Sequence, residues 1–160
     1  AARPLAHLAI MGDTSGKGFW DNVPELREFV RTHPPLDRHV HFTGYLADQE
    51  LVELMNGAAA LVFPSLWEGF GLPAVEAMAC GLPVLASRRG SLPEVVGDAG
   101  LFFDPESPPA IADCLLQFLD DEDLRLRLRE IALNRARLFT WERAAELAEG
   151  CFHRCHAETR

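Results

Sequence analysis

Two glutamates and two glycines within one short stretch have the types and the spacing of a binding site. Glu68 is followed by Gly69 and Gly71, and Glu76 lies inside a helix that we expect over 72–80. Glycines permit backbone paths that side chains would block, and a carboxylate, a pure acceptor, suits paired hydroxyl groups. The first amides of such a helix have no internal partners and attract an anion such as a phosphate. The stretch therefore predicts a site for a ligand with a phosphate and sugar hydroxyls, whereas solvated glutamates near a helix start are the simpler alternative.

The elements that must position this stretch alternate along the chain. We expect strands at 5–11, 39–43, 60–63, 83–86 and 101–103, and helices at 24–32, from 48, 72–80, 92–96, 108–119, 122–139 and from 140 to about 156. This alternation predicts an α/β protein, a three-layer sandwich with a mostly parallel sheet buried on both faces and a helical C-terminus. Because ligands lie beyond the carboxyl ends of parallel strands, the loops to inspect are 12–18, 44–48, 64–72 and 87–93. No Gly/Ser linker interrupts the pattern, so we expect one domain over 1–160.

Composition excludes several classes of protein. The 160 residues include 15 Lys and Arg against 24 Asp and Glu, a formal charge of −9, so we expect no general affinity for nucleic acid. No apolar run approaches the roughly 18 residues of a membrane span, although membrane contact is left open. Four scattered cysteines favour a reduced, cytoplasmic setting. Cys151 and Cys155 lie beside two histidines, but no second half of a zinc site follows, so we expect no metal.

The stretch from Glu68 to Glu76, Glu-Gly-Phe-Gly-Leu-Pro-Ala-Val-Glu, resembles the glutamate, seven residues, glutamate motif of a known family. That family is the retaining GT-B glycosyltransferases of family four (glycosyl transferases group 1). The resemblance covers roughly residues 5 to 150, and its further matching segments, in chain order, are 41–51, 60–65, 76–84, 92–97 and 139–141. It implies that the chain is the Rossmann-like, donor-binding C-terminal domain of such an enzyme.

The resemblance also implies roles for single residues. Glu68 would lie beside the donor sugar as the candidate catalytic residue, and Glu76 would bind the ribose hydroxyls of the nucleotide. The backbone amides of Phe70, Gly71 and Leu72 would contact the sugar and the diphosphate.

Two earlier loops would hold the nucleotide itself. Gly12, after the first strand, would let the nucleotide approach the backbone. Gly44, Tyr45 and Leu46 would line the base pocket. The resemblance thus implies a GDP, UDP or ADP sugar as donor substrate, with no metal and no further cofactor required. The segment around Trp67 looks most like that of mannosyl- or rhamnosyl-type members, which favours a mannose-like hexose moved in polysaccharide biosynthesis.

The chain departs from the family pattern at its start. In the family an earlier strand and loop carry a basic pair for the diphosphate, and here Lys17 is the only basic residue in the first strand-end loop. The acceptor-binding N-terminal domain, the expected partner of this half, is absent as well. We therefore expect a fragment that binds the donor weakly and is inactive alone.

Three other features of the sequence allow different interpretations. Gly69 to Ala74 fits G-x-G-x-x-A, and Arg88 with Arg89 could hold a 2′-phosphate, which would make an NADP site, but this fingerprint normally follows the first strand. The segment 12–18 fails the Walker A spacing. The leucines between 115 and 128 could dock a partner in a non-catalytic interaction domain, or pack on the sheet.

Overall fold

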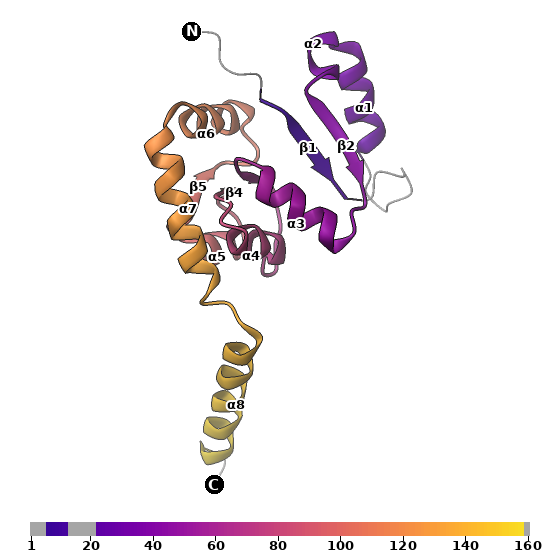
Figure 1. Cartoon of the computed structure of the whole chain (residues 1–160). Helices are drawn as coiled ribbons and strands as arrows, with labels where there is room; N and C mark the ends of the chain where they lie inside the picture. The colour runs from indigo at the N-terminus through magenta and orange to yellow at the C-terminus, as the bar shows by residue number, and fades with distance from the viewer. Residues whose placement is uncertain (1–5, 13–21, 159–160) are drawn as a thin grey trace. The chain divides into compact units, whose positions relative to one another are not determined.

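The computed structural model describes residues 6–12 and 22–158 of the chain (Figure 1). The chain divides into two compact units, Ala1–Val52 and Glu53–Arg160. No separate linker joins them, because helix α3 (Asp48–Gly57) runs through the division. Each unit is described by itself.

The first unit is built on two parallel strands. Strands β1 (Leu8–Met11) and β2 (Val40–Gly44) pair in parallel, with Leu8 opposite Val40 and an irregularity in register after Ile10. Helices α1 (Val23–Thr32) and α2 (Pro34–Asp37) connect them, each with a proline at its start, where the missing N–H costs nothing. The short helix α2 has no counterpart in the sequence prediction, since two successive prolines are typical of a loop.

The prediction that all strands are buried on both faces is wrong for the first unit. Leu8 in β1 is 47% exposed, and Leu26 and Phe29 of α1 are exposed as well. Two strands and two short helices supply too little apolar surface to cover both faces of a sheet, so the apolar run of β1 stays partly open to solvent.

The second unit carries a three-stranded sheet in the order β3-β4-β5, and all its strand pairs are parallel. Its strands are β3 (Leu61–Phe63), β4 (Val84–Ser87) and β5 (Gly100–Phe103). Its helices are α4 (Leu72–Ala79), α5 (Leu92–Val96), α6 (Pro108–Asp120), α7 (Glu122–Ala136) and α8 (Trp141–Glu158). The alternation of strands and helices confirms the predicted α/β class.

The core of the second unit surrounds the central strand β4, whose four residues are all buried. Leu85 of β4 belongs to one apolar cluster with Phe103, Cys114 and Phe118, which brings α6 onto one face of the sheet. Side chains alternate along a strand, so Val84 and Ala86 lie on the opposite face, and helices α4 and α5 also contact β4 (Figure 1). The sheet therefore has helices on both faces.

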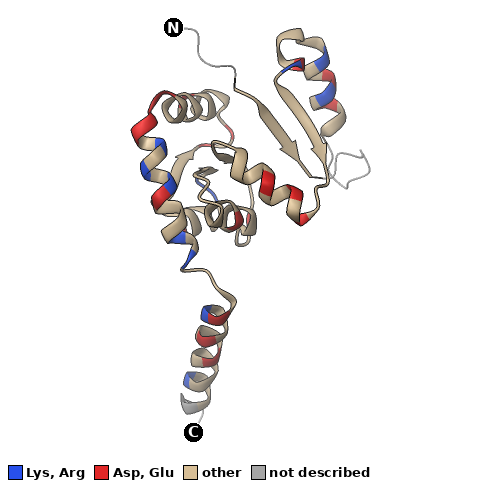
Figure 2. Cartoon of the chain, in the orientation of Figure 1, with Lys and Arg blue, Asp and Glu red and all other residues tan. Residues whose placement is uncertain are grey.

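The leucines of the helical C-terminus divide between core and surface. Leu124 and Leu128 join the core cluster, which is the packing role that the sequence left as one alternative. Leu126 is 62% exposed. Both acidic and basic side chains lie along α7 and α8 (Figure 2), so this part of the surface presents no field of one sign.

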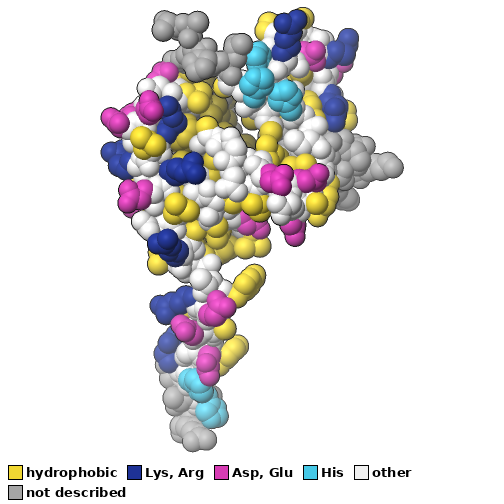
Figure 3. Space-filling view, viewed as in Figure 1, with side chains coloured by type: hydrophobic (Ala, Val, Ile, Leu, Met, Phe, Trp, Pro, Cys, Tyr) yellow, Lys and Arg dark blue, Asp and Glu magenta, His cyan; other side chains and the backbone are white. Residues whose placement is uncertain are grey.

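Histidine side chains gather in the first unit, and a second group lies toward the end of α8 (Figure 3). In the first group, His7 Nδ1 lies 2.9 Å from His41 Nε2, and the His7 ring contacts the His39 ring edge to face. The contact between His7 and His41 supplements the backbone hydrogen bonds between β1 and β2. Within the part of the chain that the structure describes, no helix combines the length and the apolar character needed to cross a lipid bilayer.

Candidate functional site

The loop from Pro64 to Gly71 joins the end of β3 to the start of α4 and is tied to the next strand. The Ser87 hydroxyl donates to the Ser65 carbonyl at 2.5 Å, and Ser65 in turn donates to the Trp67 carbonyl at 2.8 Å. Ser87 ends β4 and is fully buried. A buried hydroxyl needs such a partner, so the first half of the loop is anchored at the carboxyl edge of the sheet, where parallel sheets bind ligands.

The second half of the loop rests on the segment between β4 and α5. Ser91 Oγ donates to the carbonyl oxygens of Phe70 at 2.8 Å and Glu68 at 3.3 Å. Gly90 has a φ of +55°, and a Cβ there would stand 2.6 Å from the Glu68 carbonyl oxygen. The prediction named 87–93 as a loop to inspect but did not single out Gly90 and Ser91. Their only mark in the sequence is that a Gly-Ser pair follows an apolar strand.

Gly71 makes the turn into α4. Its φ is +97°, and a Cβ would meet Leu92 Cδ2 at 2.9 Å, so a side chain is excluded both by conformation and by space. The prediction assigned the same need to Gly69, and there the structure differs. A Cβ at Gly69 would meet nothing within 4 Å.

The N-terminus of α4 offers backbone donors. Helix α4 has no side-chain cap, no acidic residue in its first turn, and Pro73 near its start. The N–H groups of Phe70, Gly71 and Leu72 have no hydrogen-bond acceptor among the described residues. Three consecutive free donors at the positive end of a helix dipole are the arrangement that binds phosphate.

The two glutamates flank this helix start in different ways. The Glu68 side chain is half-buried, and its Cγ lies 3.5 Å from the position of a Gly71 Cβ, so its stem covers the turn. The Glu76 side chain is exposed, one turn inside α4, and has no hydrogen-bond or ion-pair partner within the described part of the chain. Both carboxylates are therefore free to accept hydroxyl groups.

Apolar side chains border the same loop. Phe70 is 45% exposed and meets the Phe139 ring edge to face, with centroids 5.8 Å apart. Arg135 lies over Phe139 at 5.4 Å and also donates to the carbonyl oxygens of Val95, at 3.1 Å, and Glu94. The residues after the last turn of α7 thus contact the loop through Phe139, over which Arg135 lies.

The residues predicted in the first unit also come together at a strand end. Gly12 donates its N–H to the Gly44 carbonyl at 3.1 Å, at the carboxyl ends of β1 and β2, and both have positive φ. Tyr45 follows and is 83% exposed. The structure therefore forms two groups of predicted site residues, one in each unit. Lys17 and most of the segment 12–18 lie outside the described residues.

The two arginines that an NADP site would need differ in their contacts. Arg89 pairs with Glu106 at 2.7 Å and with Asp104 at 3.8 Å, while Arg88 lies over the Phe102 ring at 5.3 Å. A search of residues 6–12 and 22–158 finds no cluster of His, Cys, Asp and Glu suited to a metal ion.

Comparison with known proteins decides the family. The model of the family "Glycosyl transferases group 1" matches residues 4–135. This chain belongs to the group 1 glycosyltransferases. That assignment, together with the ion pairs of Arg89, decides against the dinucleotide alternative.

Several group 1 glycosyltransferases and related structures resemble the chain. It is 47% identical to O-antigen chain mannosyltransferase B of Escherichia coli over 103 residues, 64% of this chain and 27% of that protein. Sucrose-phosphate synthase of Thermosynechococcus elongatus superposes with a TM-score of 0.79 at 29% identity, covering 96% and 39% of the two chains. HepE of Anabaena, solved with UDP and glucose, gives a TM-score of 0.79 at 27% identity, covering 94% and 41%. The predicted fold is thereby confirmed, and the chain spans less than half the length of each of these proteins.

Proposed function

We propose that this chain binds a nucleotide-diphosphate sugar at the start of α4 and forms the donor-binding half of a retaining hexosyltransferase. The observation that carries the proposal is the group of three free N–H donors at Phe70, Gly71 and Leu72, flanked by Glu68 and Glu76. Membership of the group 1 glycosyltransferases and the likeness to a structure solved with UDP and glucose support it.

The donors at α4 suit the chemistry of sugar transfer. When the bond from the anomeric carbon to the diphosphate breaks, negative charge develops on the departing phosphate oxygen. Fixed N–H groups aimed at that oxygen stabilise the charge without reorganising, an effect worth roughly 3–4 kcal/mol per donor in other enzymes. Glu68 would hold hydroxyls of the donor sugar as the catalytic residue, and Glu76 would accept the two ribose hydroxyls.

For the first unit taken by itself, we propose that Gly12, Gly44 and Tyr45 contact a nucleotide. Gly12 and Gly44 have positive φ, a Cβ at Gly12 would meet nothing within 4 Å, and Tyr45 offers an exposed ring for the base. The base would be that of a GDP, UDP or ADP sugar. The mannosyltransferase of Escherichia coli at 47% identity favours a mannose-like hexose.

The donor needs no metal or further cofactor in this proposal, because backbone amides replace the cation at the diphosphate. The acceptor site would belong to an N-terminal domain outside these 160 residues, the partner that completes a cytoplasmic enzyme. The chain alone would bind donor without transferring sugar.

Titration calorimetry with GDP, UDP, ADP and their sugars tests the proposal. One of the nucleotides should bind the wild-type chain, and Glu76→Ala should weaken that binding about 10-fold or more, because two hydroxyl-to-carboxylate hydrogen bonds are lost. Glu130→Ala, an exposed glutamate on α7, should leave it unchanged. Binding of NADP in place of every nucleotide sugar, undisturbed by Glu76→Ala, would overturn the proposal.

A further inference from the structure

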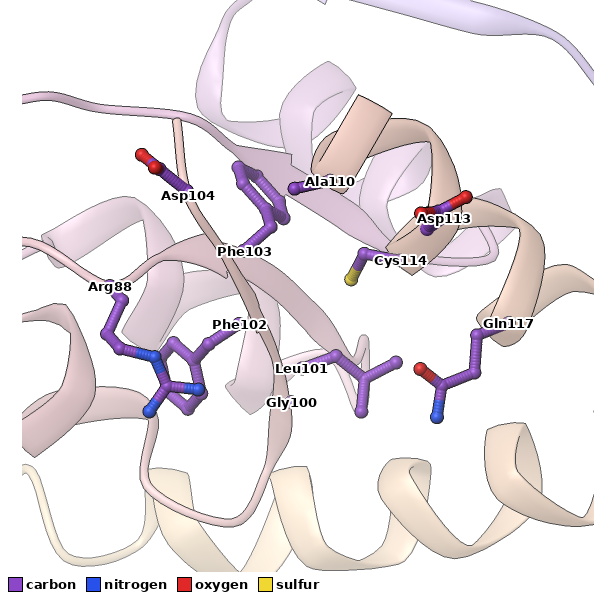
Figure 4. A pocket seen from close by; sticks show the side chains of 10 residues that line it. All are labelled: Arg88, Gly100, Leu101, Phe102, Phe103, Asp104, Ala110, Asp113, Cys114 and Gln117. Atoms are coloured by element: carbon purple, nitrogen blue, oxygen red, sulfur yellow. The ribbon is translucent and has the colours of Figure 1, made fainter. Parts of the chain in front are cut away.

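An open groove of about 570 Å³ follows the free edge of β5 in the second unit. Among the described strands, β5 pairs only with β4. Residues from both faces of β5 line the groove, with Leu101 and Phe103 on the α6 face and Phe102 on the other, so the space must run alongside the strand edge (Figure 4). One face of α6 forms the wall of the groove, through Ala110, Asp113, Cys114 and Gln117.

The backbone of β5 has free hydrogen-bonding groups on this edge. Arg88 donates its N–H to the Phe103 carbonyl at 3.0 Å, and Val84 donates to the Ala99 carbonyl at 3.5 Å. Backbone groups alternate in direction along a strand, so the N–H and the C=O of Phe102 point away from β4, into the groove. The strand, Gly-Leu-Phe-Phe, contains none of the charges or prolines that usually protect an open edge.

Charge disfavours a second copy of this chain as the occupant. A second β5 strand, Gly-Leu-Phe-Phe, carries no charged side chain to set against Arg88 or Asp113. Arg88 lies on the Phe102 face at 5.3 Å from the ring, whereas Asp113 lies on the α6 face (Figure 4). The groove therefore offers opposite charges on the two faces of an added strand.

We propose that this groove binds an extended peptide segment of another protein, which joins the sheet as a strand beside β5. Adjacent residues of a strand point to opposite faces, so the segment carries an acidic residue toward Arg88 and a neighbouring basic residue toward Asp113. The outward N–H and C=O of Phe102 supply the ladder bonds. The four-residue length of β5 sets the segment at about four residues, or roughly 13 Å.

Amide NMR with a defined peptide tests the proposal. The probe is the capped hexapeptide Thr-Val-Lys-Glu-Val-Thr, titrated into the whole chain. The Phe102 amide signal should shift, and its exchange with solvent should slow at least 10-fold on binding. A fully N-methylated version, which cannot donate ladder bonds, should bind at least 10-fold more weakly, and a version with Gln replacing Lys and Glu about 3-fold more weakly.

Variants of the chain locate the contact. Phe102→Pro removes the outward N–H and should abolish binding, whereas Phe102→Ala keeps it and should bind, with circular dichroism to verify folding. If Phe102→Pro does not fold, Asp113→Asn should still weaken binding about 3-fold, and Asp98→Asn, at an exposed aspartate away from the groove, should not. Absence of a shift at 100–104, equal binding of the N-methylated peptide, or dimerisation of the chain through this edge would each overturn the proposal.

Discussion

The carbonyl oxygen of Glu68 lies against Gly90 so closely that a Cβ on Gly90 would stand 2.6 Å from it. Gly90 follows β4 and Glu68 follows β3, so this contact joins the loops that leave two neighbouring parallel strands. The backbone of Glu68 is thereby fixed, while its carboxylate remains available for a ligand. A residue two loops away thus helps to set the position of the candidate catalytic group.

Gly90→Ala should disturb this contact. The substitution adds a Cβ at a φ of +55° and forces it into the Glu68 carbonyl, so we expect a loss of about 1–3 kcal/mol in the free energy of unfolding. Chemical denaturation measures it. Gly69→Ala is the matched control, because a Cβ there meets nothing within 4 Å, and its unfolding free energy should change by less than about 0.5 kcal/mol. Equal losses in the two variants would refute the account of this contact.

Ser91→Ala should reduce nucleotide binding more than stability. The substitution removes a hydroxyl whose single proton is directed at the carbonyl oxygens of Phe70 and Glu68, an interaction worth roughly 0.5–1.5 kcal/mol in total. Ser107→Ala provides the comparison, because loss of its cap bond to the Ala110 amide should cost about 1 kcal/mol of stability without touching the loop. Calorimetry should show weaker nucleotide binding for Ser91→Ala alone, and weakened binding in both variants would contradict this role.

Arg135→Lys should destabilise the chain by about 1–3 kcal/mol, because an ammonium cannot reproduce the planar fork that donates to Val95 and Glu94. Thermal unfolding measures the loss. Arg137 lies two positions further along the chain, and its exposed side chain donates to Asn134. Arg137→Lys should therefore change the melting temperature little. A melting temperature that falls equally in both variants would argue against a specific role for Arg135.

Alkaline pH should weaken the fold through Cys114. Burial raises the pKa of this thiol above its ordinary value of 9.0. As the pH rises through 9.0, the unfolded chain loses the proton while the folded chain keeps it, so the free energy of unfolding declines until the folded pKa is passed. Cys114→Ala should lose this decline, and Cys151→Ala, an exposed thiol, should retain it. Denaturation curves between pH 7 and about 10.5 decide between these outcomes.

Local patterns predicted the elements around the site well. A proline near the first turn and an apolar face predict both α4 and α6. Helix α4 (Leu72–Ala79) is one residue shorter than the predicted helix, and α6 (Pro108–Asp120) is one residue longer than predicted. The predicted end of α7 at Phe139 lies three residues too far, because the chain closes there with the turn bonds Leu138 to Arg135 and Phe139 to Ala136. Helix ends depend on such weak bonds and are hard to place from sequence.

The contacts that hold the loop were not predictable in the same way. Ser87, Gly90 and Ser91 act on backbone atoms more than 20 residues away, and the residue types reveal nothing about that distance. The exposure of β1 was missed for a related reason. An apolar run indicates that burial of the strand is favourable. Whether β1 is buried depends on how many other elements surround it.

Amide NMR of the whole chain during titration with GDP, UDP and ADP tests the central claim most directly. The account predicts that one nucleotide shifts the amide signals of Phe70, Gly71 and Leu72, because the diphosphate accepts hydrogen bonds from these groups. Glu76→Ala should weaken the response and Glu130→Ala should not. Nucleotide binding that leaves these three amides unchanged would contradict a diphosphate site at the start of α4.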